Sequence, residues 1–275
     1  MMECVVCGQR MDQTLPWLFD CPSCGFGAST LDAAEGRGVE GLESLRRRNF
    51  QTLCDRLSKQ YELQDKRLLE VGCAEGWFLE EARKRNMRPV AIEPSPEHAD
   101  MARGKGFEVI DGFFPDCANF EEPFDFIVFN DVFEHLPEPV AAIRHCENLL
   151  KPGGALVLNL PSNKGIIYRL AGLFSRLGRP SLLERLWQKG LPSPHLTYFN
   201  PVTLQQFVTR HTALEFVDGF SLDTLVADGL ADRVRVSHPG LLGRFITLGL
   251  TAAVPLFRIL PADITVGVFE KKSGR

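Results

Sequence analysis

Four cysteines near the start of the chain form two pairs with the spacing of a metal site: Cys4 and Cys7, then Cys21 and Cys24. A glycine follows each pair and frees the turn after the second thiol. Four thiolates arranged in this way can close a tetrahedral site around zinc. Unrelated buried cysteines or disulfides are the alternative, which the tight pairing disfavours. We therefore expect a structural zinc ribbon at residues 1–30, whose four protein ligands leave no open position for catalysis.

A second candidate site lies in residues 67–82, where a short apolar run ends at Gly72 and helix-forming residues resume at Trp77. This pattern predicts a strand, a tight glycine turn and a helix whose first N–H groups can bind a polar ligand. Gly72 and Gly76 suit the turn, and Ala74 is small enough for a ligand to approach the main chain. A dinucleotide site would need a small residue at position 77, so the tryptophan there argues against a dinucleotide.

Two further acidic residues follow predicted strands. Glu93 stands 21 residues after Gly72, where α/β nucleotide sites place a carboxylate on the ribose hydroxyls. It could instead cap the helix expected from Pro96 or be a solvated loop acid. Asp111 and Phe113 follow the next strand, and an acid and an aromatic ring there suit an adenine amino group and ring face. Of Phe113 and its neighbour Phe114, we expect one to be ordinary core.

The densest set of chemically capable side chains follows the apolar run 124–129: Asn130, Asp131, Glu134 and His135, joined by the distant His195. Either histidine could accept a proton near neutral pH. Carboxylate oxygens and imidazoles in this set could instead bind a divalent cation. A structural role, in which each histidine anchors a loop through hydrogen bonds, is the third interpretation.

The elements that must position these residues alternate between strand and helix. Apolar runs predict strands at 67–71, 89–93, 107–111, 124–129, 154–160, 214–218 and 263–270, and helical spacing predicts helices at 42–61, 96–105, 140–150 and 204–211. Such alternation implies an α/β fold with a largely parallel sheet whose ligands sit beyond the carboxyl ends of the strands. The first helix carries Arg46, Arg47 and Arg48, which we expect on a solvated outer face.

The pattern Glu70-x-Gly72-x-Ala74-x-Gly76, the segment 124–139 and the segment 149–154 together resemble the class I S-adenosylmethionine-dependent methyltransferases, in the broad group that includes the ubiquinone-pathway O-methyltransferases. The resemblance covers about residues 40–220. It implies a Rossmann-like domain at 67–275 with a mostly parallel seven-stranded sheet whose last strand is antiparallel, preceded by a linker and leading helix at 31–66. The cofactor S-adenosylmethionine would be bound by Glu70, Gly72, Cys73, Ala74, Gly76, Trp77, Glu93, Pro94, Asp111, Gly112, Phe113, Asn130 and Asp131.

The same resemblance implies catalytic roles for Glu134, His135 and His195. Methyl transfer from a sulfonium is an in-line displacement, so the protein must orient the acceptor and, for a hydroxyl, remove its proton. Metal-dependent relatives carry a Glu-x2-Glu-His motif, and this chain has the shorter Asp131 in the first place. A divalent cation at the active site is therefore an alternative to a simple histidine base.

Two insertions, 162–200 and 221–262, interrupt the α/β pattern. Between Lys164 and Lys189 lie six basic residues and one acid, a local charge of +5 that indicates an anionic acceptor or surface, or the solvated rim of an amphipathic lid. In the second insertion residues 245–257 are uncharged but too few to span a bilayer, which leaves a buried helix or an interfacial one and hence peripheral membrane contact.

The 275 residues carry a net charge of −4 and open without a secretory signal, so we expect a cytoplasmic protein with reduced thiols. We predict methyl transfer to a hydroxyl or carbon of a polar, anionic small molecule such as a nucleotide- or lipid-linked sugar. Methylation of ribosomal RNA or another nucleic acid is an alternative, disfavoured by the net acidity and by Asn130-Asp-Val-Phe where such enzymes carry an Asn-Pro-Pro-Tyr-like tetrad. A non-catalytic, zinc-bearing interaction protein is the other alternative. The sequence specifies no oligomeric state.

Overall fold

The computed structural model describes residues 2–32, 42–225, 230–231, 234, 240–257 and 259–272. Most of the predicted linker before the first helix, and part of the second insertion, lie outside these residues.

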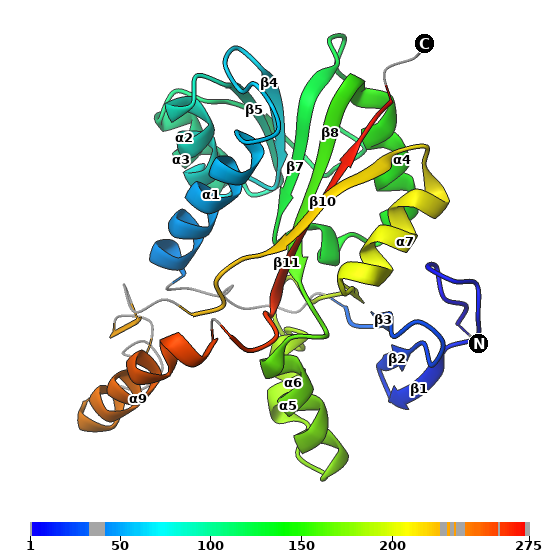
Figure 1. Cartoon of the computed structure of the whole chain (residues 1–275), viewed down its shortest axis with the longest axis vertical. Coiled ribbons are helices and arrows are strands. Elements are labelled where there is room, and N and C mark those ends of the chain that lie inside the picture. Colours follow the sequence, from blue (N-terminus) through cyan, green and yellow to red (C-terminus); the bar gives the residue numbers. More distant parts are fainter. Residues whose placement is uncertain are drawn as a thin grey trace.

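A seven-stranded sheet forms the centre of the molecule, with the strand order β10-β11-β8-β7-β4-β5-β6 (Figure 1). Its strands are β4 (Arg67–Val71), β5 (Arg88–Glu93), β6 (Glu108–Asp111), β7 (Phe124–Asn130), β8 (Leu150–Pro161), β10 (Glu215–Ser221) and β11 (Ile264–Glu270). Neighbouring strands from β8 to β6 pair in parallel, and β11 is antiparallel to both β8 and β10. The predicted mostly parallel, Rossmann-like sheet is therefore confirmed.

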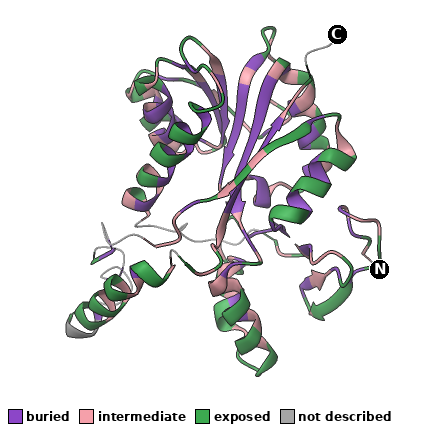
Figure 2. Ribbon diagram, in the orientation of Figure 1, coloured by how far each residue is buried: buried purple, intermediate pink, exposed green. Residues whose placement is uncertain are grey.

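Helices cover both faces of this sheet. They are α1 (Glu43–Leu57), α2 (Trp77–Lys84), α3 (Pro96–Gly104), α4 (Pro139–Leu149) and α7 (Pro201–His211). The side chains of α1 and α2 pack on one face with Leu68 and Val128, whereas α4 and α7 pack on the other face with Leu69 and Phe129. Because both faces are covered, most residues of the central strands are buried, as Figure 2 shows.

The three arginines of the first helix, which we expected on a solvated outer face, contact other elements of the domain. Each of its three consecutive arginines lies within ion-pair distance of an acid from another element: Arg46 of Asp131, Arg47 of Glu80 and Arg48 of Asp223. The guanidinium of Arg47 also lies over the ring of Trp77, 5.5 Å from its centre. The triplet therefore ties α1 to the domain.

The N-terminal residues form a second, antiparallel sheet with the order β1-β2-β3-β9. It contains β1 (Asp12–Leu15), β2 (Leu18–Asp20) and β3 (Gly27–Ser29), and its fourth strand, β9 (Thr197–Tyr198), comes from the first insertion. The alternation of Leu15, Trp17 and Phe19 in the sequence predicts one short strand between the cysteine pairs, but the chain turns between β1 and β2 and Trp17 lies in the turn. Trp17 is buried there against Trp187, with the ring centres 5.8 Å apart.

Three helices lie at the end of the molecule where the parallel strands finish, below the sheet in Figure 1. They are α5 (Ile166–Arg176) and α6 (Ser181–Leu186) from the first insertion and α9 (Leu241–Phe257) from the second. Within the described part of the chain, no helix combines the length and the apolar character that a membrane span requires.

Candidate active site

The turn between β4 and α2 has the backbone conformation that the sequence predicted. Gly72, Ala74 and Gly76 all have positive φ, at 74°, 46° and 78°. The Gly72 N–H donates to the carbonyl of Ile92 in β5, so the turn lies directly against the neighbouring strand. A Cβ on Gly72 would lie 2.5 Å from Cγ2 of Val132, which leaves room only for glycine.

Glu93 holds this turn from the end of β5. Its buried carboxylate accepts from the N–H of Ala74 at 2.8 Å and from the N–H of Ser95 at 2.9 Å. Each carboxylate oxygen can accept more than one hydrogen bond, so capacity remains for a ligand. Glu93 is in register with Asp111 of β6, which places the two predicted acids at the same edge of the sheet.

The residues beyond β6 divide between surface and core. Phe113 is 72% exposed, whereas Phe114 is buried against Phe129 with the ring centres 5.5 Å apart. Phe114 is therefore the one of these two phenylalanines that belongs to the core, as we expected for one of them. The Asp111 carboxylate lies 2.7 Å from a guanidinium nitrogen of Arg103, and Pro94 is exposed beside the turn.

Glu70 is buried under the turn and is linked to the ends of β7 and, through it, β8. Nδ2 of Asn130 donates to Oε1 of Glu70 at 2.9 Å, and Nδ2 of Asn159 donates to Oδ1 of Asn130 at 3.1 Å. Burial raises the pKa of Glu70 well above its ordinary value, although the bond from Asn130 opposes the shift. Among the described residues, Oε2 of Glu70 has no hydrogen-bond partner. Cys73 is also buried, and Trp77 is partly covered by Arg47.

Glu134, His135 and His195 lie close together in the structure, although His135 and its hydrogen-bond partner Pro194 are 59 positions apart in the sequence. Glu134 and His135 lie in the short 3₁₀ helix η1 (Phe133–His135), and His195 precedes β9. One ligand atom from each of the three residues lies within 4.8 Å of the others. Oε1 of Glu134 is 3.9 Å from Nε2 of His195 and 4.0 Å from Nε2 of His135.

Hydrogen bonds define which nitrogen of each ring carries the proton. Nδ1 of His135 lies 2.9 Å from the carbonyl of Pro194, which can only accept, so Nδ1 is protonated and Nε2 has a free lone pair in the neutral ring. Nε2 of His195 lies 2.9 Å from the amide nitrogen of Gln188 and accepts its hydrogen, so in the neutral ring Nδ1 carries the proton. Gln188 has no periodic or spacing signal, and the sequence did not identify it.

Burial favours the uncharged form of all three side chains. It raises the pKa of Glu134 well above its ordinary value, and the negative charge of Asp131 adds to the shift. Burial lowers the pKa of His135, and it lowers the pKa of His195 further with the help of the His135 charge. Both histidines are therefore neutral near pH 7, the form that can accept a proton or bind a metal.

Asp131 does not belong to this three-residue group. It has a positive φ of 54°, and its carboxylate lies 3.4 Å from Nε of Arg46 in α1. Arg46 of α1 therefore lies beside the segment that joins β7 to η1. The sequence placed this arginine on the outside, because helical spacing alone does not report which loop lies opposite.

The four N-terminal cysteines form a second group that could hold a metal among the described residues, with all four sulfurs within 4.8 Å of one another. Sγ of Cys4 is 3.6 Å from Sγ of Cys24, and Sγ of Cys7 is 3.5 Å from Sγ of Cys21. Tetrahedral zinc with bonds of about 2.3 Å separates its sulfur ligands by about 3.8 Å, so the thiols fit that ion.

Comparisons with known proteins agree on one family. Residues 42–211 match the family described as "Methyltransferase domain". The chain is 30% identical over 171 residues to the ubiquinone biosynthesis O-methyltransferase of Xylella fastidiosa (strain 9a5c), an alignment that covers 60% of this chain and 67% of that protein.

Solved structures share the fold. The cyclopropane synthase MmaA2 from Mycobacterium tuberculosis superposes with a TM-score of 0.56 at 18% identity, covering 87% of this chain and 88% of that one. The mycolic acid cyclopropane synthase CmaA1, solved with S-adenosylhomocysteine, gives a TM-score of 0.55 at 19% identity, with 79% and 82% of the two chains covered. The chain belongs to the methyltransferase domain family and is a class I S-adenosylmethionine-dependent methyltransferase.

Proposed function

We propose that the enzyme methylates a hydroxyl group of a polar, anionic small molecule, such as a nucleotide- or lipid-linked sugar. The observation that carries the proposal is the group of Glu134, His135 and His195, in which Glu134 and His195 are buried and His135 is partly buried. The group adjoins the glycine turn through Val132. Oxygen is favoured over carbon because neutral histidines suit removal of a hydroxyl proton. The name of the Xylella relative, an O-methyltransferase, supports the same choice.

The cofactor half of the site is assigned to the residues around the carboxyl ends of β4 to β7. Glu93 would bind the ribose hydroxyls, Asp111 and Phe113 the adenine, and the turn from Gly72 to Gly76 the methionine portion. Around them lie the remaining proposed contacts: Glu70, Cys73, Trp77, Pro94, Gly112, Asn130 and Asp131. When bound, S-adenosylmethionine supplies the electrophilic methyl group.

His135 is the better candidate for the base. Its Nε2 lone pair is free, and its Nδ1 proton is held by the Pro194 carbonyl, so the ring is fixed in the accepting tautomer. Nε2 of His195 is already engaged by Gln188. Glu134, which burial holds uncharged, would offer the imidazolium that forms on His135 a carboxyl oxygen as a hydrogen-bond acceptor, 4.0 Å from Nε2 in this structure.

A divalent cation is the alternative use of the same three side chains. Two imidazole nitrogens and one carboxylate oxygen form a ligand set that suits several divalent metals. A cation would bind the acceptor oxygen and lower its pKa, in place of proton removal by His135. Metal analysis of the purified protein separates the two mechanisms. One ion per chain is the zinc expected at the cysteines and favours the histidine base. A second ion per chain would indicate a cation at the Glu134, His135 and His195 group.

The anionic acceptor is proposed from the charge of the first insertion. Four arginines of α5, α6 and their connection are exposed: Arg169, Arg176, Arg179 and Arg185. The single acid between Lys164 and Lys189, Glu184, is paired with Lys189. The exposed arginines are therefore available to phosphate groups of an acceptor or of a lipid surface.

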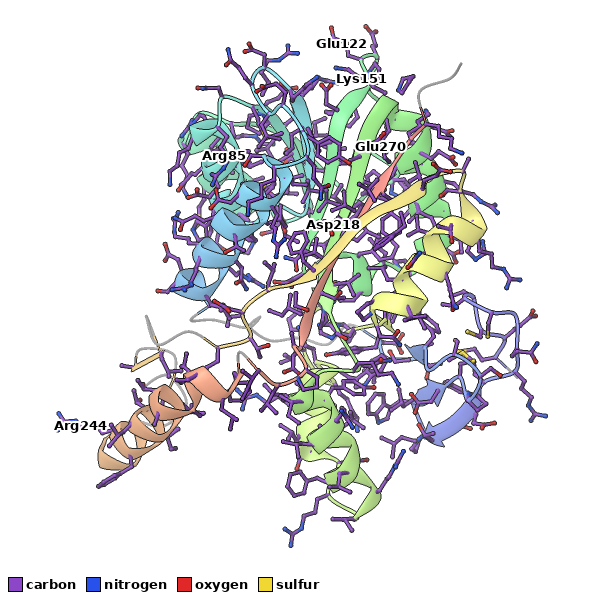
Figure 3. All side chains as sticks on the ribbon, viewed as in Figure 1. Arg85, Glu122, Lys151, Asp218, Arg244 and Glu270 are labelled. Atoms are coloured by element: carbon purple, nitrogen blue, oxygen red, sulfur yellow. The ribbon has the colours of Figure 1, made fainter. Side chains whose placement is uncertain are left out.

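Peripheral membrane contact is proposed from exposed apolar side chains of α5 and α9. Leu173 and Leu177 of the α5 end and Phe245 and Leu248 of α9 are 52%, 68%, 71% and 69% exposed. Figures 1 and 2 show α5 and α9 extending from the same end of the molecule with exposed outer surfaces, and Figure 3 shows Arg244 at the outer end of α9. Apolar residues flanked by arginines match an interface with anionic lipid headgroups.

Transfer of a labelled methyl group from S-adenosylmethionine tests the acceptor class. The panel contains nucleotide-linked sugars, lipid-linked sugars in vesicles, a phenol and ribosomal RNA. We expect transfer to a sugar substrate, with His135→Gln lowering kcat at least about a hundredfold and leaving S-adenosylhomocysteine affinity unchanged. His98→Gln, in α3, is the control. Transfer to RNA alone would reject the small-molecule proposal.

Sedimentation with vesicles tests the membrane proposal. Wild type should bind vesicles containing anionic lipid and not neutral vesicles, and Leu173→Glu with Leu177→Glu should abolish binding. Val202→Glu, at an exposed apolar position on α7, is the matched control and should bind as wild type does. Equal loss in the control would show that added charge, and not the position of the apolar residues, weakens binding.

A further inference from the structure

The edge strand of the zinc ribbon is hydrogen-bonded to the segment that carries His195. The N–H of Ser29 donates to the carbonyl of Leu196 at 2.9 Å, and Oγ of Ser29 donates to the carbonyl of His195 at 2.7 Å. Beyond them β3 pairs with β9, with Gly27 opposite Tyr198. Ser29 therefore fixes two successive carbonyls at the candidate catalytic histidine.

The other side of the same segment is bonded to the remaining catalytic residues. The N–H of Leu196 donates to the main-chain carbonyl of Glu134 at 2.8 Å, and Nδ1 of His135 donates to the carbonyl of Pro194 at 2.9 Å. Residues 194–196 thus lie between the ribbon and η1 and are hydrogen-bonded to both. A displacement of β3 would be transmitted to both histidines and to Glu134.

The position of β3 depends in turn on the cysteine site. The strand starts three residues after Cys24, and the carbonyl of Gly25 between them accepts from Nδ2 of Asn163 at 2.7 Å. Phe26 packs against Phe199, with the ring centres 4.9 Å apart. A ribbon this small has little apolar core of its own, so metal binding supplies much of its folding free energy.

The cofactor turn is held by different contacts. Gly72 bonds to Ile92, Ala74 to Glu93 and Gly76 to Cys73, all within the β4–α2–β5 unit. Gly72 meets the segment before η1 only by packing on Val132, so loosening the ribbon should leave the hydrogen bonds of this turn in place.

We infer that the zinc ribbon forms one wall of the acceptor site and that Ser29 is a positioning residue for His195 and, through Leu196, for Glu134. The cysteine-bound metal then controls the order of the catalytic segment and not the affinity for the cofactor. The assignment of this wall to the acceptor site rests on the proposed function. The coupling between the ribbon and the histidines is measured by hydrogen–deuterium exchange, which needs no acceptor.

Hydrogen–deuterium exchange of the full-length, zinc-loaded protein tests the role of Ser29. Ser29→Ala should raise exchange in residues 194–199 and 132–136 roughly three- to tenfold, the effect of losing one hydrogen bond. Exchange in residues 70–93, zinc content and S-adenosylhomocysteine affinity should stay unchanged. Ser29→Thr, which keeps the hydroxyl, should restore protection. Thr30→Ala is the control, because Thr30 is the exposed neighbour and its N–H, not its side chain, bonds to Trp17.

Removing zinc from wild type with a chelator should produce the same regional pattern with a larger amplitude. Equal exchange in Ser29→Ala and Thr30→Ala would overturn the positioning role. A uniform rise that includes residues 70–93, or loss of S-adenosylhomocysteine binding, would show that the ribbon supports the whole domain instead. If the regional pattern holds but every small-molecule acceptor fails, the proposed acceptor class is wrong and the coupling stands.

Discussion

Gly72 and Val132 pack so closely that a Cβ atom on Gly72 would lie 2.5 Å from Cγ2 of Val132. Val132 directly precedes η1, so the turn assigned to the cofactor and the segment bearing Glu134 and His135 are in van der Waals contact. The turn proposed to bind the cofactor and the segment proposed to be catalytic therefore meet at Gly72, where there is no space for a side chain.

Gly72→Ala should therefore impair both stability and cofactor binding. The positive φ of 74° and the overlap with Val132 together predict a loss of about 2–4 kcal/mol in the free energy of unfolding. Urea denaturation and calorimetric titration with S-adenosylhomocysteine measure the two effects. Gly172→Ala in α5 is the control, since nothing lies within 4 Å of its Cβ position, and it should be neutral or slightly stabilising. Similar results for both variants would contradict the steric argument.

Glu93→Ala should weaken S-adenosylhomocysteine binding at least about tenfold, which is about 1.4 kcal/mol. The substitution removes the carboxylate proposed for the ribose and the acceptor for the Ala74 N–H. Glu93→Gln keeps one acceptor oxygen for the turn, so affinity lost in both variants would identify the carboxylate itself as the requirement. Glu97→Ala, at an exposed position in α3, should bind normally.

Glu70→Gln should make the protein more stable at neutral pH. Because the pKa of Glu70 is raised in the folded state, the unfolded chain releases this proton at lower pH, and stability falls as pH rises from about 4.5 through the raised value. Glutamine removes that fall and still accepts from Asn130. Urea unfolding at pH 5 and pH 8 should show a smaller difference for Glu70→Gln than for wild type and for the exposed control Glu121→Gln. An unchanged difference would exclude Glu70 as the titrating group.

Trp187→Ala should destabilise the chain by about 3–5 kcal/mol, because the fully buried indole fills the core between the ribbon and the first insertion. Thermal unfolding measures the loss. Phe245→Ala removes a large aromatic ring from the surface of α9 and should cost less than about 0.5 kcal/mol. A small effect at Trp187 would mean that ribbon and insertion are not packed through this ring.

Features encoded by neighbouring residues were predictable. The strands that end at Val71, Glu93 and Asp111 are each a short apolar run closed by a glycine or an acid, so their order, and with it the parallel sheet, followed from spacing. The cysteine pairs and the turn from Gly72 to Gly76 are likewise local, because each needs particular backbone angles over only a few residues.

Contacts between distant loops were decided only by the tertiary structure. The pairing of β3 with β9, the reach of Arg46 to Asp131 and the bond from Gln188 to His195 join segments whose relative positions depend on how helices pack on the sheet. Trp17 is a further contact that local spacing does not predict. Its alternation with Leu15 and Phe19 suits a strand, yet it lies in a turn, where it is buried against Trp187. The sequence by itself determined the family, the sheet and the chemically capable residues, because these depend on local spacing. Folding alone decided that the ribbon is hydrogen-bonded to the segment of His195, because that contact depends on surfaces meeting across the chain.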